Sequence, residues 1–263
     1  MRIATWNINS VRARTERAVG VLGRWNLDVL LLQETKCRPE QFPVESFRDA
    51  GYEVAAHGLD QWNGVAIVSR VGIEDLAVGF DGQPAFAKEH DDGALLAAPR
   101  LEARAIAATC AGVRVWSLYV PNGRSVDDPH YRYKLDFLAR LREEAASALA
   151  ADPGTQLLLA GDWNVIPEDG DVWDPELFNP FFREADPFGE AGVVEVTRQA
   201  EEAPYTFWDY QRLRFPKNHG MRIDFAWAAP KLASRVTGAH IDRNERKGKG
   251  ASDHVPVIID MED

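Results

Sequence analysis

The feature of this sequence that most constrains its fold is a series of short apolar runs, spread from one end of the chain to the other. The runs are rich in Val, Ile, Leu and aromatic residues, and they have the length of buried strands. They lie at residues 2–9, 29–34, 64–69, 103–110, 113–120, 156–165, 222–228 and 255–261. This pattern predicts a layered fold with β-sheets at its centre.

Helical periodicity occurs between these runs in two places. Apolar residues recur every three or four positions over 11–25, and Ser10 is suited to cap the start of this helix. A clearer apolar stripe covers 131–149, and the Asp-Pro-Gly segment at 152–154 ends it. Helices kept apart from hairpin-length strands favour an α/β fold with two sheets packed face to face and helices outside them.

No boundary divides the chain. It has 263 residues without a Ser/Gly linker, a low-complexity tract or a block of charge, so we expect one domain over residues 1–263. A weak internal repeat relates the two halves, because LLLQE at 30–34 resembles LLLAGD at 157–162 and both segments end in an acid.

Composition limits the partners and the compartment. The formal net charge of −11 argues against binding nucleic acid by overall charge, although a local basic surface could still meet a polyanion. No apolar run approaches the ~18 residues of a membrane span, and the first residues lack the apolar centre of a signal peptide. Cys37 and Cys110 have no zinc-site spacing. We therefore expect a cytoplasmic protein without a membrane partner.

Acids and amides gather at the ends of the apolar runs. Asn7 and Asn9 share one face of the first run, Glu34 ends the second, and Asp162 and Asn164 lie two residues apart. A carboxylate beside an amide can take a proton from water and hold the resulting hydroxide. Structural alternatives stay open: the two asparagines could cap a turn, Glu34 could face solvent, and the Asp162 segment could form an Asx-turn.

A histidine close to the C-terminus has an acidic neighbour. Asp253 and His254 precede the last apolar run, and a further acid, Asp224, could orient His254 and keep it protonated for donation to an oxyanion. Oxygen donors without a His/Cys cluster indicate Mg²⁺ or Mn²⁺ rather than zinc. Such a cation commonly binds phosphate, which makes phosphodiester hydrolysis the natural reaction. The sequence contains none of the P-loop, dinucleotide-binding, hydrolase-elbow or zincin motifs.

Taken together, these segments resemble the exonuclease III branch of the endonuclease/exonuclease/phosphatase superfamily. The matching motifs follow one another in order along nearly the whole chain: TWNIN at 5–9, LQETK at 32–36, NGVAI at 63–67, LYVPNG at 118–123, GDWN at 161–164, YTFWDY at 205–210, RIDF at 222–225 and SDH at 252–254. The resemblance implies a four-layer α/β sandwich, with two mixed, mainly antiparallel sheets flanked by helices. It also implies a Mg²⁺-dependent enzyme that cleaves DNA 5′ to abasic sites and removes nucleotides or blocking groups from 3′ ends.

The resemblance assigns roles to the matching positions. Glu34 would bind the metal with help from Asn7 and Asp253. Asp162 would activate or orient the attacking water, and Asn164 would hold the water and the phosphate. His254, oriented by Asp224, would stabilise charge on the phosphate in the transition state. Tyr119 would hydrogen-bond the phosphate or the leaving group, unless it is a core tyrosine with a satisfied hydroxyl.

Substrate contacts are expected at three further positions, Asn122, Trp208 and Arg222. In the family, the aromatic residue that matches Trp208 packs against the sugar that has lost its base, whose extrusion costs little. Basic residues with interleaved aromatics around these positions favour a surface that follows the DNA backbone, although such runs also occur on solvated faces. They are Arg212, Arg214, Lys217, Arg243, Arg246, Lys247 and Lys249.

One stretch departs from the family pattern and two other functions compete. Residues 176–190 are shorter than expected, which leaves open the balance between abasic-site incision and exonuclease action. An enzyme of this fold acting on a phosphorylated lipid or inositol is the first alternative. A catalytically inactive DNA-binding protein is the second. The basic WDY region argues against the first and the complete residue set against the second, so we expect a monomer that acts on duplex DNA with abasic sites or 3′ ends.

Overall fold

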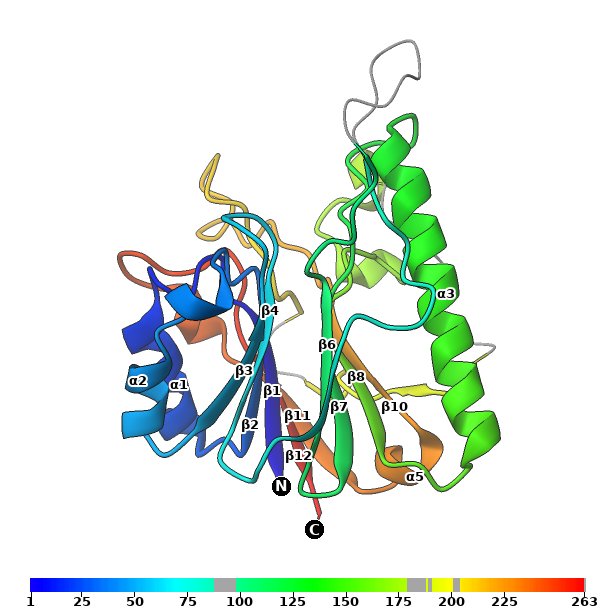
Figure 1. The fold of residues 1–263 in the computed structure, drawn as a ribbon. Helices are drawn as coiled ribbons and strands as arrows, with labels where there is room; N and C mark the ends of the chain where they lie inside the picture. Colours follow the sequence, from blue (N-terminus) through cyan, green and yellow to red (C-terminus); the bar gives the residue numbers. More distant parts are fainter. Residues whose placement is uncertain (88–97, 179–187, 189–190, 201–203, 263) are drawn as a thin grey trace.

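Two six-stranded β-sheets face each other at the centre of the molecule, and helices lie on their outer faces (Figure 1). The computed structural model describes residues 1–87, 98–178, 188, 191–200 and 204–262. This arrangement confirms the four-layer α/β sandwich that the sequence predicts.

The first sheet, sheet A, is built from both ends of the chain. Its strand order is β11-β12-β1-β2-β4-β3, and its one parallel pair is β1 with β2. The helices α1 (Thr15–Trp25) and α2 (Val44–Asp49) cover its outer face (Figure 1). The strands are β1 (Arg2–Asn7), β2 (Val29–Gln33), β3 (Glu53–His57), β4 (Val65–Ser69), β11 (Val236–Ile241) and β12 (Val257–Met261).

The second sheet, sheet B, repeats this topology. Its order is β5-β6-β7-β8-β10-β9, with β7 and β8 as the parallel pair and the long helix α3 (Pro129–Ala151) on its outer face (Figure 1). The unit β7-α3-β8 thus corresponds to β1-α1-β2, and the repeated LLL segments occupy the equivalent strands β2 and β8. The strands are β5 (Glu74–Val78), β6 (Ala105–Cys110), β7 (Val113–Tyr119), β8 (Leu157–Asp162), β9 (Val194–Glu195) and β10 (Asp224–Ala228).

Short helical turns complete the described elements. The α-helical turns are α4 (Pro175–Phe178) and α5 (Pro230–Ala233). The 3₁₀ turns are η1 (Pro39–Gln41), η2 (Asp169–Asp171) and η3 (Arg243–Arg246). Within the part of the chain that the structure describes, no helix is long and apolar enough to cross a membrane.

The core between the sheets explains why the central strands are apolar on both faces. Leu31 of β2 and Val115 of β7 belong to the same fully buried cluster, and helices cover the opposite faces. One polar contact also joins the sheets, because Gln33 Nε2 donates to Ser117 Oγ at 2.9 Å and Ser117 Oγ donates to the Leu32 carbonyl at 2.8 Å. Both side chains are completely buried, so this contact sets the sheets in one relative position.

The structure corrects the start of the first helix. Helix α1 begins at Thr15, and Arg14 takes the N-cap position that the sequence assigns to Ser10. The Ser10 and Val11 amides instead donate to the carbonyls of Glu34 and Thr35 at 2.7 and 3.2 Å. The chain after β1 therefore pairs with the chain after β2 before it turns into the helix. The departing stretch at 176–190 lies mostly outside the described residues, apart from the end of α4 and Phe188.

Candidate active site

The ends of central strands bring the candidate residues to one end of the sandwich. Asn7 ends β1 and Glu34 follows β2, while Tyr119 and Asp162 end the neighbouring strands β7 and β8. Asp224 begins β10, where it lies directly opposite Asp162 in the antiparallel register. The carboxyl ends of parallel strand pairs in two facing sheets thus meet at a single place.

Asn7 joins the carboxylates of the two sheets. Its Nδ2 donates to Glu34 Oε1 at 2.8 Å and to Asp162 Oδ2 at 2.9 Å. Its amide oxygen, which was expected to help hold a metal, instead accepts the Asn9 amide at 3.1 Å. In this structure Asn7 therefore fixes the spacing of the two carboxylates.

A lysine that the sequence interpretation gave no role neutralises Glu34. Lys36 Nζ lies 2.8 Å from Glu34 Oε2 and also donates to Asn9 Oδ1 at 2.5 Å. Burial alone would raise the pKa of Glu34, but the charge and hydrogen bond of Lys36 outweigh it and the pKa is lowered. Glu34 is therefore a carboxylate at neutral pH. Its motif, LQETK, contained the signal for Lys36.

His254 is held between two acids. Its Nδ1 lies 2.9 Å from Asp224 Oδ2, and its Nε2 lies 3.8 Å from Asp162 Oδ2. Burial would lower the pKa of His254, but the negative charges of Asp224 and Asp162 raise it above its ordinary value. The ring is therefore an imidazolium. Since 3.8 Å is too long for a hydrogen bond, its Nε2–H can donate to an anion that enters the site.

Two residues keep these acids in place. Thr206, which the sequence interpretation missed within its YTFW segment, donates from Oγ1 to Asp224 Oδ2 at 2.6 Å. The Asn164 amide donates to Asp162 Oδ1 at 3.0 Å. Burial raises the pKa of Asp162 above its ordinary value, and the charge of His254 opposes part of that rise. A buried carboxylate with a raised pKa is a stronger base than one in water.

Asn164, Asn122 and Tyr119 complete the sheet B side. Asn164 Oδ1 accepts a hydrogen bond from Asn122 Nδ2 at 3.1 Å. Asn164 Nδ2 donates to the Val120 carbonyl at 2.9 Å. Burial raises the pKa of Tyr119, and a hydrogen bond to Glu34 adds to the rise, so this hydroxyl keeps its proton at neutral pH. Tyr119 thus contacts Glu34, and Asn122 is linked to Asp162 through Asn164.

The donor set fits a divalent cation. Glu34, Asp162 and His254 place ligand atoms within 4.8 Å of one another. An imidazolium has no lone pair to offer, so the ligands in this group are the oxygens of Glu34 and Asp162, which suit a hard cation. Asp253, an expected ligand, lies outside this group, and its Oδ1 accepts from Asn9 Nδ2 at 2.9 Å. A chain of polar contacts through Asn9 and Lys36 therefore links Asp253 to Glu34.

Two expected substrate contacts are wrong. Trp208 is completely buried, with its ring packed edge-on against Phe215 and its Nε1 donating to Asn218. Neighbouring residues of an extended segment face opposite ways, and Phe207 is the one whose ring lies 4.8 Å from the His254 ring. Arg222 is also buried, because its guanidinium donates to the Thr197 carbonyl in the interior.

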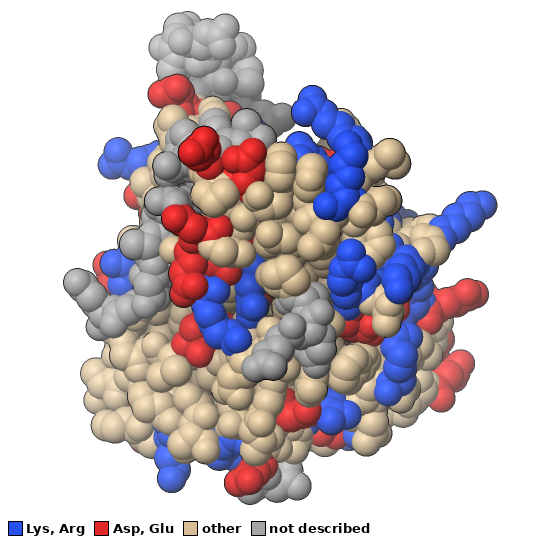
Figure 2. All heavy atoms as spheres, turned by 180° about the vertical axis from the view of Figure 1, so that it is seen from behind, with Lys and Arg blue, Asp and Glu red and all other residues tan. Residues whose placement is uncertain are grey.

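The two basic segments that the sequence predicts lie together beside His254. Arg243 stacks 4.4 Å from the Phe215 ring and Arg246 lies 4.8 Å from the Tyr210 ring, which joins the loops 209–219 and 243–249. We call these two loops the basic rim. In the upper right part of Figure 2, on the sheet A side, Lys and Arg side chains gather on the surface. This region of the surface is basic, although the net charge of the chain is negative.

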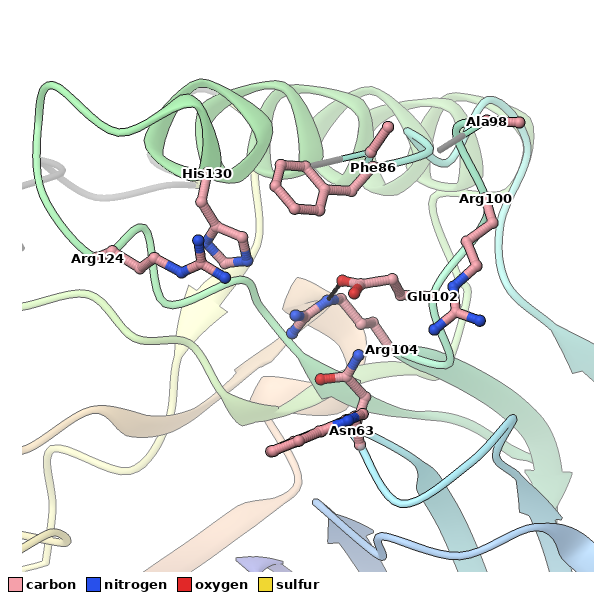
Figure 3. Close-up of a pocket in the computed structure, with 10 residues that line it drawn as sticks. Asn63, Phe86, Ala98, Arg100, Glu102, Arg104, Arg124 and His130 are labelled. Carbon is pink, nitrogen blue, oxygen red and sulfur yellow. Dashed lines mark hydrogen bonds and ion pairs between the residues drawn. The ribbon is translucent and has the colours of Figure 1, made fainter. Parts of the chain in front are cut away.

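A second basic surface, which the sequence interpretation missed, lies on the other side of Tyr119. This arginine pocket has a volume of about 540 Å³, and Arg100, Arg104 and Arg124 point into it (Figure 3). Each of the three arginines has an acidic partner: Arg104 pairs with Glu102 at 2.6 Å, Arg100 with Asp60 at 3.0 Å and Arg124 with Asp128 at 3.5 Å. Arg104 connects the pocket to the acids, since its guanidinium lies 4.7 Å from the Tyr119 ring. Trp62, Asn63, Phe86, Ala87, Ala98 and His130 complete the lining.

The chain is similar in sequence and fold to known proteins. The sequence profile of the Endonuclease/Exonuclease/phosphatase family matches residues 4–254. The chain belongs to this family. Exodeoxyribonuclease III from Haemophilus influenzae is 25% identical to it over 98% of both chains. Among solved structures, the family member NExo from Neisseria, a 3′ phosphatase bound to a product DNA hairpin, has a TM-score of 0.88 and 30% identity, covering 100% of this chain and 99% of its own. An AP endonuclease from Archaeoglobus fulgidus has a TM-score of 0.87 and 32% identity with the same coverage.

Proposed function

We propose that this chain is a metal-dependent DNA-repair nuclease that cleaves duplex DNA 5′ to abasic sites and trims or unblocks 3′ ends. The observation that carries the proposal is the buried charge arrangement of the site: an imidazolium at His254, a carboxylate of raised pKa at Asp162, and a second carboxylate at Glu34 across the sheet interface. The similar proteins named above act on DNA, and their likeness covers the full chain.

Asp162 supplies the base. In the charged form its carboxylate can take a proton from a water molecule, and the raised pKa strengthens it for this task. Asn7 donates to Asp162 Oδ2 and the Asn164 backbone amide donates to Asp162 Oδ1. One hydrogen bond on each oxygen holds the carboxylate in one orientation. The water is then deprotonated at the place where the phosphate is bound.

Charge on the phosphate is met by donors that are already in position. His254 donates from Nε2, while Asp224 holds its other nitrogen and keeps the ring protonated. Tyr119 and the Asn164–Asn122 pair offer further polar hydrogens from the sheet B side. Donors fixed before the reaction cost no reorganisation when charge develops in the transition state.

Glu34 would hold the cation with help from Asn7 and Asp253, and we propose that this cation is Mg²⁺, with Mn²⁺ as a substitute. When bound, such an ion polarises a phosphoryl oxygen and stabilises the charge that develops on it. The ammonium of Lys36 occupies Glu34 in this structure.

Two basic surfaces would hold the DNA on either side of the acids. The basic rim lies beside His254 and the arginine pocket beside Tyr119, so a strand that crosses the site would meet cations in both directions. Phosphate contacts of this kind position a duplex without reading its sequence. We propose that the protein works as a monomer formed by one domain, in the reducing cytoplasm, where the free thiols of Cys37 and Cys110 are stable.

The other two functions considered from the sequence are not favoured. A small lipid or inositol head group would not need two separated basic surfaces. An inactive DNA-binding protein would not need the buried His254–Asp224 pair, whose charges are costly to keep in the interior.

The test uses the purified full chain and a duplex with one abasic-site analogue. We expect a cut immediately 5′ to the lesion in the presence of Mg²⁺ and none with EDTA, resolved at single-nucleotide length. A second duplex with a 3′-phosphate should lose that group. Products shortened only from the 3′ end would restrict the function to exonuclease action. No metal-dependent cleavage of either duplex would contradict the proposal.

A further inference from the structure

A buried lysine in helix α3 lies directly beneath the loop that carries Asn164. Lys134 is completely buried, on a face of the helix where Phe137, Leu138 and Leu141 are also buried. Its Nζ donates to the backbone carbonyl of Asn164 at 2.7 Å. Lysine is almost never fully buried without a specific partner, because removing an ammonium from water is costly. An apolar residue would cost less here if packing were the only requirement.

The carbonyl of Asn164 is one of several fixed points on that residue. The backbone amide of Asn164 donates to Asp162 Oδ1. Its side-chain Nδ2 donates to the Val120 carbonyl, and its Oδ1 accepts from Asn122. The Asn164 backbone has a φ of 51°, in the left-handed region that asparagine adopts more readily than most residues but in which support still helps to hold it. A charge-assisted hydrogen bond to its carbonyl supplies such support from outside sheet B.

The loop after β7 leaves room for this lysine. Gly123 has a φ of 88°, and a Cβ atom there would lie 3.0 Å from Lys134 Cδ and 3.2 Å from the Tyr131 ring. His130, one helical turn before Lys134, accepts the Gly123 amide at its Nδ1 at 3.0 Å. Residues four apart share one face of a helix, so α3 holds both the 120–123 loop and the 163–165 loop through a single face.

On the basis of the proposed function, we propose that Lys134 is a positioning residue: its buried ammonium fixes the Asn164 carbonyl and, through it, the amide that faces the substrate phosphate. Without this cation the Asn164 carbonyl loses its charged donor and the peptide can rotate. Both the Asp162 contact and the side-chain amide would then shift. DNA binding depends on the distant basic surfaces and would change little.

The test compares Lys134→Met with a control on the same face of the helix, Leu141→Ala. Lys134→Met should lower kcat on the abasic duplex by about 10- to 100-fold with little change in KM, because a small displacement of a reacting group has effects of this size. Leu141→Ala should lower Tm and leave kcat unchanged. If Lys134→Met does not fold, Lys134→Gln, which is shorter and uncharged, should show the same loss of kcat.

A double substitution separates positioning from general support. Adding Lys134→Met to Asn164→Ala should cost less kcat than Lys134→Met costs on its own, because Lys134 acts in part through the Asn164 side chain, which is already removed. A second full loss on top of Asn164→Ala, or a Lys134→Met enzyme with normal kcat, would overturn the proposal.

Amide exchange gives a readout that does not depend on activity. In Lys134→Met, the Asn164 amide proton should exchange at least about tenfold faster than in the unsubstituted protein, while the Leu141→Ala control keeps its protection. Unchanged protection would overturn the role of Lys134. Absence of DNA cleavage by the unsubstituted protein would instead contradict the proposed function, and the exchange measurement would still decide the positioning role.

Discussion

At the scale of single residues, strand alternation explains which of two neighbouring aromatic side chains serves the site. Phe207 faces His254, and Trp208 points into a buried cluster with Ala239 and Val257. The sequence places both residues next to each other in one motif and contains no signal for which of them faces inward. The acids at strand ends were predictable, because an acid that ends a buried apolar run lies at the end of the strand, outside the apolar core.

Replacing these two aromatic residues should therefore have different effects. Phe207→Ala should lower kcat/KM on the abasic duplex by about tenfold, since loss of one stacked ring costs about 1–3 kcal/mol. Trp208→Ala should lower the free energy of unfolding by about 3–5 kcal/mol, because it leaves a cavity in a closed cluster. Steady-state kinetics and urea unfolding of both variants check this. A Trp208→Ala enzyme of normal stability would contradict the buried assignment.

His130 makes the stability of the protein depend on pH. Burial lowers its pKa from 6.5 to about 4, and the charges of Arg104 and Arg124 add to the effect. The unfolded chain therefore binds this proton more readily than the native protein, so the free energy of unfolding falls as pH drops from about 6.5 towards 4. Because solvent screens part of the effect, the loss should be on the order of 1–2 kcal/mol.

The matched variant is His130→Asn, which keeps an acceptor for the Gly123 amide but does not titrate in this range. Urea unfolding of both proteins at pH 7, 6 and 5 measures the difference. We expect the gap between them to change in favour of His130→Asn as the pH falls. Parallel pH profiles would show that His130 does not carry the effect.

At the scale of elements, the strands that the sequence missed share one property. β3, β5, β9 and β11 are the four edge strands of the two sheets, and β5 is largely exposed. An edge strand has one neighbour and an open side, so it needs no continuous apolar run. The central strands are covered on both faces, which is why their apolar runs predicted them closely. The order of strands within each sheet depends on contacts far apart in the sequence and could not be predicted.

The parallel pair β7–β8 should be the most sensitive element to added volume. A Cβ atom on Gly161 would lie 1.9 Å from the Leu118 carbonyl oxygen, a backbone atom that cannot move without separating the strands. Gly161→Ala should lower the free energy of unfolding by about 3 kcal/mol or more and also reduce activity, because Tyr119 and Asp162 follow directly.

The control is Gly20→Ala in the exposed part of α1, where an added Cβ has no neighbour within 4 Å. This change should stabilise the protein by about 0.5–1 kcal/mol, because alanine is the better helix former. Thermal unfolding of the two variants gives the comparison. Equal Tm values for Gly161→Ala and the unsubstituted protein would show that β7 and β8 do not approach as closely as described.

At the scale of the whole molecule, a net charge of −11 coexists with a basic surface around the site. The sequence showed the two clusters of cations in the basic rim, but only folding joins them through Phe215 and Tyr210. The arginine pocket was not predictable, because Arg100, Arg104 and Arg124 come from separate segments without a shared motif.

DNA binding should therefore depend on salt through these cations. Arg212 and Lys217 are exposed on the 209–219 loop. Changing both to Ser should weaken binding at every salt concentration and reduce the slope of log K against log salt by about 1 per lost phosphate contact. Lys231→Ser on α5, at the far end of the sandwich, is the control and should change neither value (Figure 1). Identical slopes for the double variant and the unsubstituted protein would contradict a role of the basic rim.

The central claim is that Asp162 acts as the base in metal-dependent cleavage of DNA. The most direct test measures single-turnover cleavage of the abasic duplex in Mg²⁺ by Asp162→Asn and by the unsubstituted protein, with DNA binding measured on the same samples. We expect the variant to bind DNA normally and to cleave it at least about 100-fold more slowly, because the amide cannot take the proton from water. Near-normal cleavage by Asp162→Asn would contradict this claim.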